Sequence, residues 1–237
     1  GMNNTGEIAL LSNLMRPKVA LITNVHGVHL EQLKTERAIA EAKSEIFNGL
    51  LENGSAVLNQ DSPWINLLKS RAEKKGIKNI ITFGEDKKSD VQLLDWQSGE
   101  GKSFVKIQLN NEPYQYVLSE TGKHRALNSV GVLAVVHALG LDIRHAAECF
   151  KSISTPVGRG GQKNIDLTTG ETFCLVDESY NASPVAMKSA FSVLKSMKPG
   201  PGGRKIIVIG DMLELGKDAL KLHAELIDDL LAAKPDI

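Results

Sequence analysis

Apolar and polar residues alternate in short blocks along the first third of the chain. Residues 19–22 form a continuous apolar run, which is typical of a strand buried on both faces of a parallel sheet. Residues 33–51 carry apolar side chains at helical spacing and are followed by an Asn-Gly pair, so they predict a helix. The same pattern predicts strands at 56–59 and 79–83 and a helix within 63–75. This order predicts an α/β fold with a mainly parallel sheet flanked by helices.

The pattern changes between residues 90 and 119, where apolar and polar residues alternate one by one. Alternation at 105–109 and 114–118 indicates antiparallel strands added to the sheet, with a turn at 110–113. Longer amphipathic segments predict helices at about 123–139 and 142–151. The first part of the chain is therefore predicted to form one sheet with helices on its faces.

Residues 154–170 are rich in glycine, threonine and serine and have no apolar period, which indicates a domain boundary. We place the first domain at 1–157 and the second at 158–237. The second part is predicted to contain buried strands at 173–176 and 206–209 and helices at 184–197 and 213–233. Two strands and two helices are too few for an independently stable domain. We therefore expect this unit to pack against the first or to be cut off at its C-terminus.

Composition narrows the class of protein. Lys and Arg number 28, as do Asp and Glu, so the formal net charge is zero and no global field attracts nucleic acid or an anionic membrane. No apolar run approaches the ~20 residues that span a bilayer, and the N-terminal residues lack a signal-peptide pattern. Cys149 and Cys174 have neither CxxC nor metal spacing. We expect a cytoplasmic monomer with two buried free thiols, no nucleic-acid partner and no membrane insertion.

Two places in the first half carry polar residues that a plain core would not require. Residues 23–31 follow a buried strand directly, and His29 and Glu31 there could hold a metal or contact a substrate. A solvated loop histidine is the alternative. Lys43 lies on or beside an apolar helix stripe. It either extends its amine to the solvent at the helix edge or points it into a site.

Two further places lie in the second half. His124 and Asn128 share one face at the start of a helix preceded by Gly122, which suits a phosphate or a purine edge, although ordinary capping explains them equally. Residues 158–160 (GRG) contribute an arginine. Residues 177–182 (DESYNA) contribute two acids directly after the predicted strand at 173–176. A Gly-Asp pair at 210–211 follows the predicted strand at 206–209 in the same way. Two such loops at parallel strand ends predict a ligand cleft.

These places, in this order, resemble motifs of the Mur ligases of bacterial peptidoglycan synthesis. The similar strings are TNVxxxHLE at 23–31, AKxEIF at 42–47, a NADD-like strand end at 59–62, a GxHNxxN-like helix start at 122–128, PVxGR at 156–159, a DDSYNANP-like loop at 177–184 and GDMLELG at 210–216. The resemblance covers nearly the whole chain. It implies an incomplete Mur ligase central (ATPase) domain joined to a partial Rossmann-like C-terminal unit.

The resemblance also implies an activity. The SYNAxP and GDMLELG strings are similar to those of the family member that adds D-alanyl-D-alanine to UDP-N-acetylmuramoyl tripeptide. It implies that ATP phosphorylates the tripeptide carboxylate and that the dipeptide amine attacks the resulting acyl phosphate. Such chemistry needs cations against the charge that develops on the phosphoryl group, so ATP and Mg²⁺ are the implied cofactors.

Roles for single residues follow from the resemblance alone. His29 and Lys43 are implied to be catalytic and to bind Mg²⁺, with Lys43 carbamylated. ATP-binding roles are implied for Asn59, His124, Asn128, Arg159, Asp177 and Glu178. Binding of D-alanyl-D-alanine is implied for Ser179, Tyr180 and Asn181.

The chain departs from the family pattern in several places. Arg125 and Ser183 stand where asparagine is usual, and Glu178 replaces an aspartate. The family's GxxGKT phosphate loop is absent from the sequence, so we expect this chain alone to be inactive. Two alternatives are a short, non-catalytic relative that binds a nucleotide or a partner protein, and a ligase similar to folylpolyglutamate synthase. The SYNAxP and GDMLELG strings argue against the second.

Overall fold

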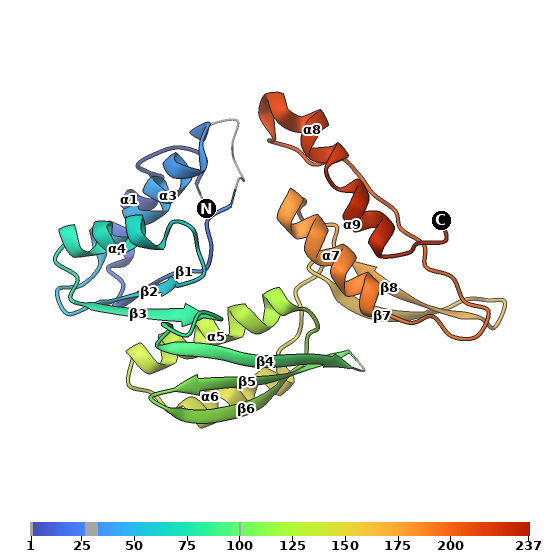
Figure 1. Ribbon diagram of the computed structural model, residues 1–237, viewed down its shortest axis with the longest axis horizontal. Helices are drawn as coiled ribbons and strands as arrows, with labels where there is room; N and C mark the ends of the chain where they lie inside the picture. Colours follow the sequence, from blue (N-terminus) through green and yellow to red (C-terminus); the bar gives the residue numbers. More distant parts are fainter. Residues whose placement is uncertain (1, 27–32, 100) are drawn as a thin grey trace.

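The computed structural model describes residues 2–26, 33–99 and 101–237, which form two units side by side (Figure 1). In these ranges the first unit contains a six-stranded sheet in the order β1-β2-β3-β4-β5-β6. Its strands are β1 (Val19–Ile22), β2 (Ser55–Asn59), β3 (Asn79–Gly84), β4 (Val91–Gly99), β5 (Lys102–Leu109) and β6 (Glu112–Leu118). Neighbours from β1 to β4 are parallel, whereas β4, β5 and β6 pair antiparallel. The predicted α/β class is confirmed, with a mixed sheet.

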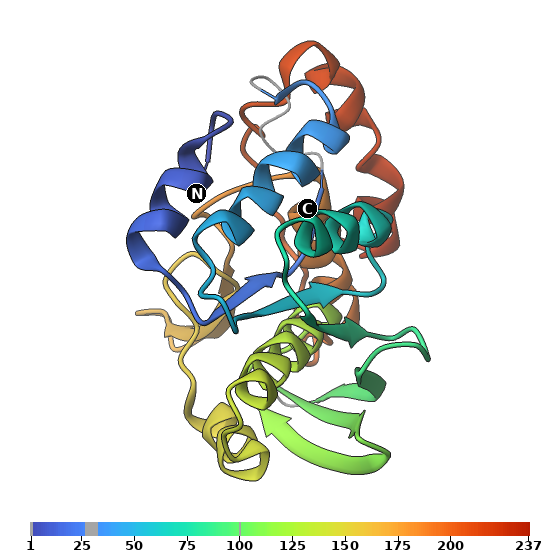
Figure 2. The ribbon, with the colours of Figure 1, turned by 90° about the vertical axis from the view of Figure 1, so that its left-hand side faces the viewer.

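Helices cover both faces of the parallel strands of this sheet, whereas the antiparallel strands β5 and β6 are covered on one face only (Figure 2). They are α1 (Glu7–Met15), α3 (Glu36–Ser44), the 3-10 helix η1 (Glu45–Gly49), α4 (Ile65–Lys74), α5 (Lys123–Ala138), α6 (Ile143–Cys149) and the 3-10 helix η2 (Phe150–Ser152). In β2, Ala56 and Leu58 pack with α3 and α4, while Val57 packs with α5. Both faces of β2 are therefore buried, which explains its apolar sequence.

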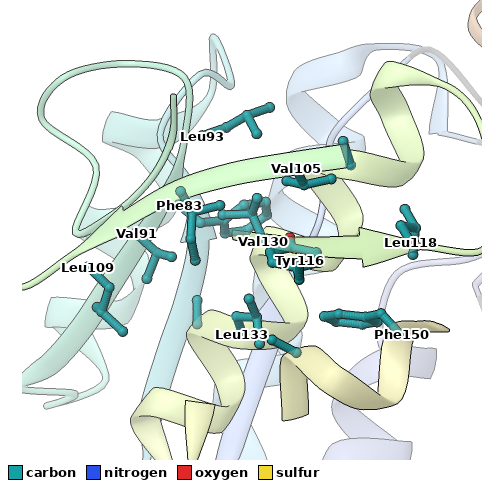
Figure 3. Close-up of a cluster of buried hydrophobic side chains, with 14 of the residues drawn as sticks. Phe83, Val91, Leu93, Val105, Leu109, Tyr116, Leu118, Val130, Leu133 and Phe150 are labelled. Atoms are coloured by element: carbon teal, nitrogen blue, oxygen red, sulfur yellow. The ribbon is translucent and has the colours of Figure 1, made fainter. Parts of the chain in front are cut away.

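The larger core of the first unit lies between the sheet and α5 (Figure 3). Phe83, Val105 and Leu133 are among its fully buried side chains. The Tyr116 hydroxyl is hydrogen-bonded to Ser129 Oγ at 2.6 Å, so these polar groups are satisfied inside the core. Because each large apolar side chain contributes about 1.5–3 kcal/mol when buried, this core holds the antiparallel strands on α5.

The sequence pattern predicted every strand of this sheet except β4. In β4 only Val91 and Leu93 are buried, and its register against β5 shifts between Leu93 and Asp95. The shift interrupts the strict alternation on which the prediction depends. The β5–β6 turn is also tighter than predicted, because Asn110 and Asn111, with φ of 52° and 64°, connect the strands by themselves.

The predicted helix at 33–51 is shorter in the structure. α3 begins after Thr35, whose hydroxyl accepts a hydrogen bond from the first turn. After α3 the chain continues as the 3-10 helix η1, which ends at Gly49. A Cβ on Gly49 would lie 2.0 Å from the backbone oxygen of Ser12 in α1. This close approach of α1 requires a glycine, and it is a tertiary contact that helical periodicity does not reveal.

The second unit is smaller and has a small core of its own. Its strands β7 (Gly161–Asp166) and β8 (Thr172–Asp177) form a two-stranded antiparallel sheet. Its helices are α7 (Pro184–Ser196), the 3-10 helix η3 (Gly216–Asp218), α8 (Ala219–Ala224) and α9 (Ile227–Ala232). The core consists of Phe191, Met212, Leu215, Leu226 and Ala233.

Several predictions for the second unit were wrong. β7 lies inside residues 154–170, the predicted domain boundary, where no strand was predicted, and β8 is mostly exposed instead of buried. Residues 206–209 form no strand, and Val208 is 94% exposed. The predicted helix at 213–233 is broken into η3, α8 and α9. In the described residues, the sheet of this unit therefore has only the two antiparallel strands β7 and β8. The boundary at 157/158 stays a prediction.

The structure also describes the exposure of the two cysteines and the hydropathy of the helices. Cys149 and Cys174 are free, but both are exposed, so the prediction of buried thiols was wrong. In the part of the chain that the structure describes, no helix has the length and hydropathy needed to cross a lipid bilayer.

Candidate functional site

Lys43 of α3 and His26, which follows β1, influence each other through charge. Lys43 is in the last turn of α3, half-buried, and burial lowers its pKa. His26 is also half-buried. Its pKa is lowered first by burial and then by the charge of Lys43, while Glu36 opposes this shift. Lys43 is therefore not a fully solvated surface lysine, and its charge acts on the His26 imidazole.

His29, the predicted partner of Lys43 in metal binding, lies outside the described residues. Among the residues that are described, no three His, Cys, Asp or Glu side chains come close enough to hold a metal ion. The metal role of His29 and Lys43 therefore stays a prediction.

Asn59 connects the ends of two parallel strands. Its side-chain amide donates to the carbonyl oxygen of Thr23 at 3.0 Å, and its Oδ1 accepts from the backbone N–H of Asp61 at 2.9 Å. The side chain is buried. Asn59 thus orients the loop after β1, and its predicted contact with ATP stays a prediction.

A cleft of about 570 Å³ lies where the two units meet. One wall comes from β4 and the start of α5, and the other from α7. Its polar lining is dominated by lysines and serines: Lys123, Lys188, Lys195, Ser98, Ser189, Ser192 and Ser196. Trp96 and Leu127 add apolar surface. An apolar wall with several cationic and hydroxyl groups suits a flat ring that carries an anionic group.

His124 lines this cleft at the start of α5. Burial, with a smaller effect of Arg125, lowers its pKa to about 4, so the imidazole is neutral at pH 7. Gly122, with φ of 112°, precedes it, and a Cβ there would lie 2.9 Å from His124 Cε1 and 3.2 Å from Val193 Cγ2 of α7. Asn128 lies one turn further along α5, is exposed, and does not line the cleft.

Beside α5, the linker between the two units (residues 153–160) runs along the loop that follows β8. The Gly160 N–H donates to the Asp177 carbonyl at 2.7 Å, and the Tyr180 N–H donates to the Gly158 carbonyl at 3.1 Å. The Arg159 guanidinium lies over the Tyr180 ring, 4.2 Å from its centroid. The structure therefore brings the predicted Arg159 and Tyr180 into direct contact.

The remaining predicted residues of this loop differ in burial. Glu178 is partly buried, and burial raises its pKa while Arg125 and Arg159 oppose the shift. Asp177 and Asn181 are more open, and their side-chain oxygens accept from the N–H groups of Ser179 and Ala182. These bonds shape the loop. The prediction that it lies at parallel strand ends was wrong, since β8 pairs antiparallel with β7.

Sequence reasoning missed three residues of this region. His26 was part of the 23–31 motif without an assigned role, and Glu120 was not considered. Arg125 was noted only as a departure from the family pattern, yet it reaches both Glu120 and the linker. Its exchange for the usual asparagine was the one signal in the sequence that pointed to these contacts.

Comparison with known proteins relates this site to a family. A model of the Mur ligase middle domain matches residues 1–136, more than half of the chain. The chain belongs to the Mur ligase family. A second model, the Mur ligase glutamate ligase domain, matches residues 167–236. The resemblance of its motifs to those of Mur ligases is thereby confirmed.

Individual relatives agree with the Mur ligase assignment. The chain is 34% identical to UDP-N-acetylmuramoyl-tripeptide--D-alanyl-D-alanine ligase of Rickettsia prowazekii over 98% of this chain and 50% of that protein. It is also 34% identical to the Bacillus subtilis protein of the same name, over 95% of this chain and 46% of that protein. The chain thus spans about half the length of the curated relatives it matches.

Solved structures of Mur ligases are similar in fold. MurF from Acinetobacter baumannii superposes with a TM-score of 0.86 over 97% of this chain and 48% of its own, at 27% identity. MurF ligase from Thermotoga maritima, solved in complex with ADP, has a TM-score of 0.79 over 96% of this chain and 50% of its own, at 30% identity. A folylpolyglutamate synthase mutant from L. casei, at 15% identity and a TM-score of 0.66, shares the fold alone.

Proposed function

We propose that this chain functions in an ATP-dependent amide ligase that joins D-alanyl-D-alanine to UDP-N-acetylmuramoyl tripeptide. The observation that carries the proposal is the lysine-lined cleft between the two units, with neutral His124 in its wall, in a chain of the Mur ligase family. The curated relatives named above carry this activity in their names. We place the reaction in the bacterial cytoplasm, with a monomer as the working unit.

Nucleotide binding is assigned to residues from both units. A neutral imidazole at His124 can donate and accept hydrogen bonds, which suits the edge of an uncharged purine. The Arg159 guanidinium supplies fixed positive charge for phosphate oxygens, and the Glu178 carboxylate can accept from ribose hydroxyls. Asn59, Asn128 and Asp177 are assigned supporting contacts with ATP. ADP in the Thermotoga maritima relative supports this assignment.

The reaction would proceed in two balanced steps. An oxygen of the tripeptide carboxylate forms a bond to the γ-phosphorus of ATP, and ADP leaves. The amine of D-alanyl-D-alanine then forms a bond to the acyl carbon, loses a proton, and inorganic phosphate leaves. Because negative charge spreads over the transferred phosphoryl group, nearby cations lower the barrier. Ser179, Tyr180 and Asn181 are assigned to the incoming dipeptide, since their loop faces the linker between the units.

Mg²⁺ is assigned to Lys43 and His29. Three properties of Lys43 support this role: it is half-buried, its pKa is lowered, and it has no acidic partner among the described residues. A neutral lysine amine can take up CO₂ with loss of a proton, which turns a cation into an anionic oxygen ligand. When bound, Mg²⁺ would supply charge to stabilise the phosphoryl oxygens.

Calorimetric titration with ADP and Mg²⁺ tests the nucleotide assignment. We expect the chain to bind ADP, and His124→Ala to weaken binding by about tenfold or more, a loss of about 1.4 kcal/mol. His145→Ala removes an exposed histidine of α6 and serves as the matched control. Absence of ADP binding, or equal binding by both variants, would contradict the proposal.

The ligase step is tested by phosphate release with tripeptide, dipeptide and ATP, each omitted in turn. Release that depends on all three substrates supports the proposed reaction, and release without D-alanyl-D-alanine contradicts the assigned acceptor. No release is what the missing phosphate-loop motif leads us to expect for this chain alone, and ADP binding then decides the nucleotide part.

A further inference from the structure

Arg125 bridges the two units through two nitrogens of one guanidinium group. Its Nη1 lies 3.6 Å from the Glu120 carboxylate, which precedes α5 in the first unit. Its Nη2 donates a hydrogen bond to the carbonyl oxygen of Arg159 in the linker. The side chains of Arg125 and Glu120 are only 19% and 12% exposed. This contact is therefore shielded from solvent, unlike ordinary surface ion pairs.

Glu178 of the second unit reaches the same place. Gly160, with φ of 83°, lies between the two side chains: a Cβ built there would be 2.6 Å from Glu178 Oε1 and 3.5 Å from Arg125 Nη2. The absence of a side chain at Gly160 lets the carboxylate and the guanidinium approach each other over the backbone. Because Glu178 is partly buried, it needs nearby positive charge to stay ionised, and both Arg125 and Arg159 provide it.

The same contacts orient Arg159. Arg125 holds its backbone carbonyl, while its own guanidinium stacks on Tyr180 at 4.2 Å. Backbone and side chain of Arg159 are thus held from opposite sides, one by the first unit and one by the second. A lysine at position 125 could not replace this, because one ammonium group lacks the planar fork that serves two acceptors in fixed directions.

We propose that Arg125 is a positioning residue that tethers the second unit to α5 and fixes the Arg159 guanidinium and the Glu178 carboxylate in one arrangement. The consequence for nucleotide affinity rests on the function proposed above, whereas the tether itself does not. Arg125 thus acts through its neighbours.

The two native cysteines allow a direct test. Cys149 lies on α6 of the first unit and Cys174 on β8 of the second, and both are free and exposed. Spin labels on these thiols report the separation of the units by pulsed electron paramagnetic resonance. We expect a single narrow distance distribution for the unmodified sequence, and a distribution at least about twofold broader for Arg125→Ala and Arg125→Lys.

Controls separate the tether from a general loss of charge or stability. Arg71→Ala removes an arginine that pairs with Glu41 on the first unit, far along the chain from the linker, and should leave the distribution unchanged. Glu120→Gln should broaden it, and Arg125→Ala/Glu120→Gln should broaden it no more than Arg125→Ala, because both act through one contact. If Arg125→Ala fails to fold by circular dichroism, Arg125→Lys and Glu120→Gln decide the question.

Unchanged distributions in folded Arg125→Lys and Glu120→Gln would overturn the proposal. ADP titration adds a second measurement: Arg125→Ala should bind ADP about tenfold more weakly, and Arg71→Ala normally. Broadened distances in a chain that binds no ADP even when unmodified would retain the tether and reject the nucleotide function. Wild-type ADP affinity in a variant with broadened distances would keep the tether but reject its positioning role.

Discussion

Two apolar segments of this molecule differ in how far they are buried. β2 (SAVLN) is buried along its whole length between parallel neighbours and helices on both faces. Residues 206–209 (IIVI) are more apolar, yet they form no strand, and Val208 is 94% exposed. Apolar character alone does not bury a segment; it is buried where the chain also supplies strands and helices that cover it. The difference predicts that the first unit carries most of the stability.

Truncation of a core side chain tests this difference with the largest expected effect. Leu133→Ala removes a fully buried side chain from the α5 core and should lower the free energy of unfolding by about 2–5 kcal/mol. Val208→Ala, in the exposed segment, should change it by less than about 0.5 kcal/mol. Urea unfolding followed by circular dichroism measures both. Equal losses would show that the second unit is as tightly packed as the first.

The junction of the two units should respond to pH through His124. Its pKa is lowered to about 4 in the folded chain from an ordinary 6.5, so the unfolded chain takes up a proton first as the pH falls. Its contribution is complete above pH 6.5 and is lost as the pH falls from 6.5 through 4, by at most about 3 kcal/mol. Melting temperatures between pH 8 and pH 4 should therefore fall less steeply in His124→Gln than in wild type. His145→Gln, on an exposed site, should match wild type.

Replacing glycine by alanine compares how closely the backbone is packed in the two units. Gly49→Ala would place a Cβ 2.0 Å from the Ser12 carbonyl oxygen, which forces α1 away from η1 and should cost about 1–3 kcal/mol. Gly200→Ala, in a loop of the second unit with nothing within 4 Å, should stay within about 0.5 kcal/mol of wild type. Thermal unfolding of the two variants provides the measurement. A neutral Gly49→Ala would refute the close packing of α1.

Helix caps give the smallest expected effect. Thr35 caps α3 in the first unit and Ser183 caps α7 in the second, each accepting a hydrogen bond from a backbone N–H of the first turn. Replacement of either by alanine should cost about 1 kcal/mol. If the second unit unfolds separately, Ser183→Ala should lower only the stability measured by hydrogen exchange in α7. A shift of the whole unfolding curve would mean that the two units unfold together.

The sequence predicted the first unit better than the second for a physical reason. In β1, β2 and β3 the burial pattern is set by adjacent parallel strands, so apolar runs and buried strands coincide. In β4 a register shift broke the alternation, and at Gly49 a tertiary contact shortened a helix that periodicity extended. Such features depend on what packs from elsewhere in the chain, which local patterns do not contain.

The same distinction between local patterns and long-range contacts applies to the candidate site. The sequence by itself determined the α/β class, the positions of the parallel strands β1, β2 and β3 along the chain, and the residue types of the site, from Lys43 to His124, Arg159 and Glu178. Only the tertiary structure decided that Arg125 reaches across to the Arg159 carbonyl and lies beside Glu178, and that the charge of Lys43 acts on His26. Residue types and their periodic spacing are local properties of a chain. Contacts between residues far apart in sequence are decided by how strands pair and helices pack, and these contacts set burial and charge at the junction of the units.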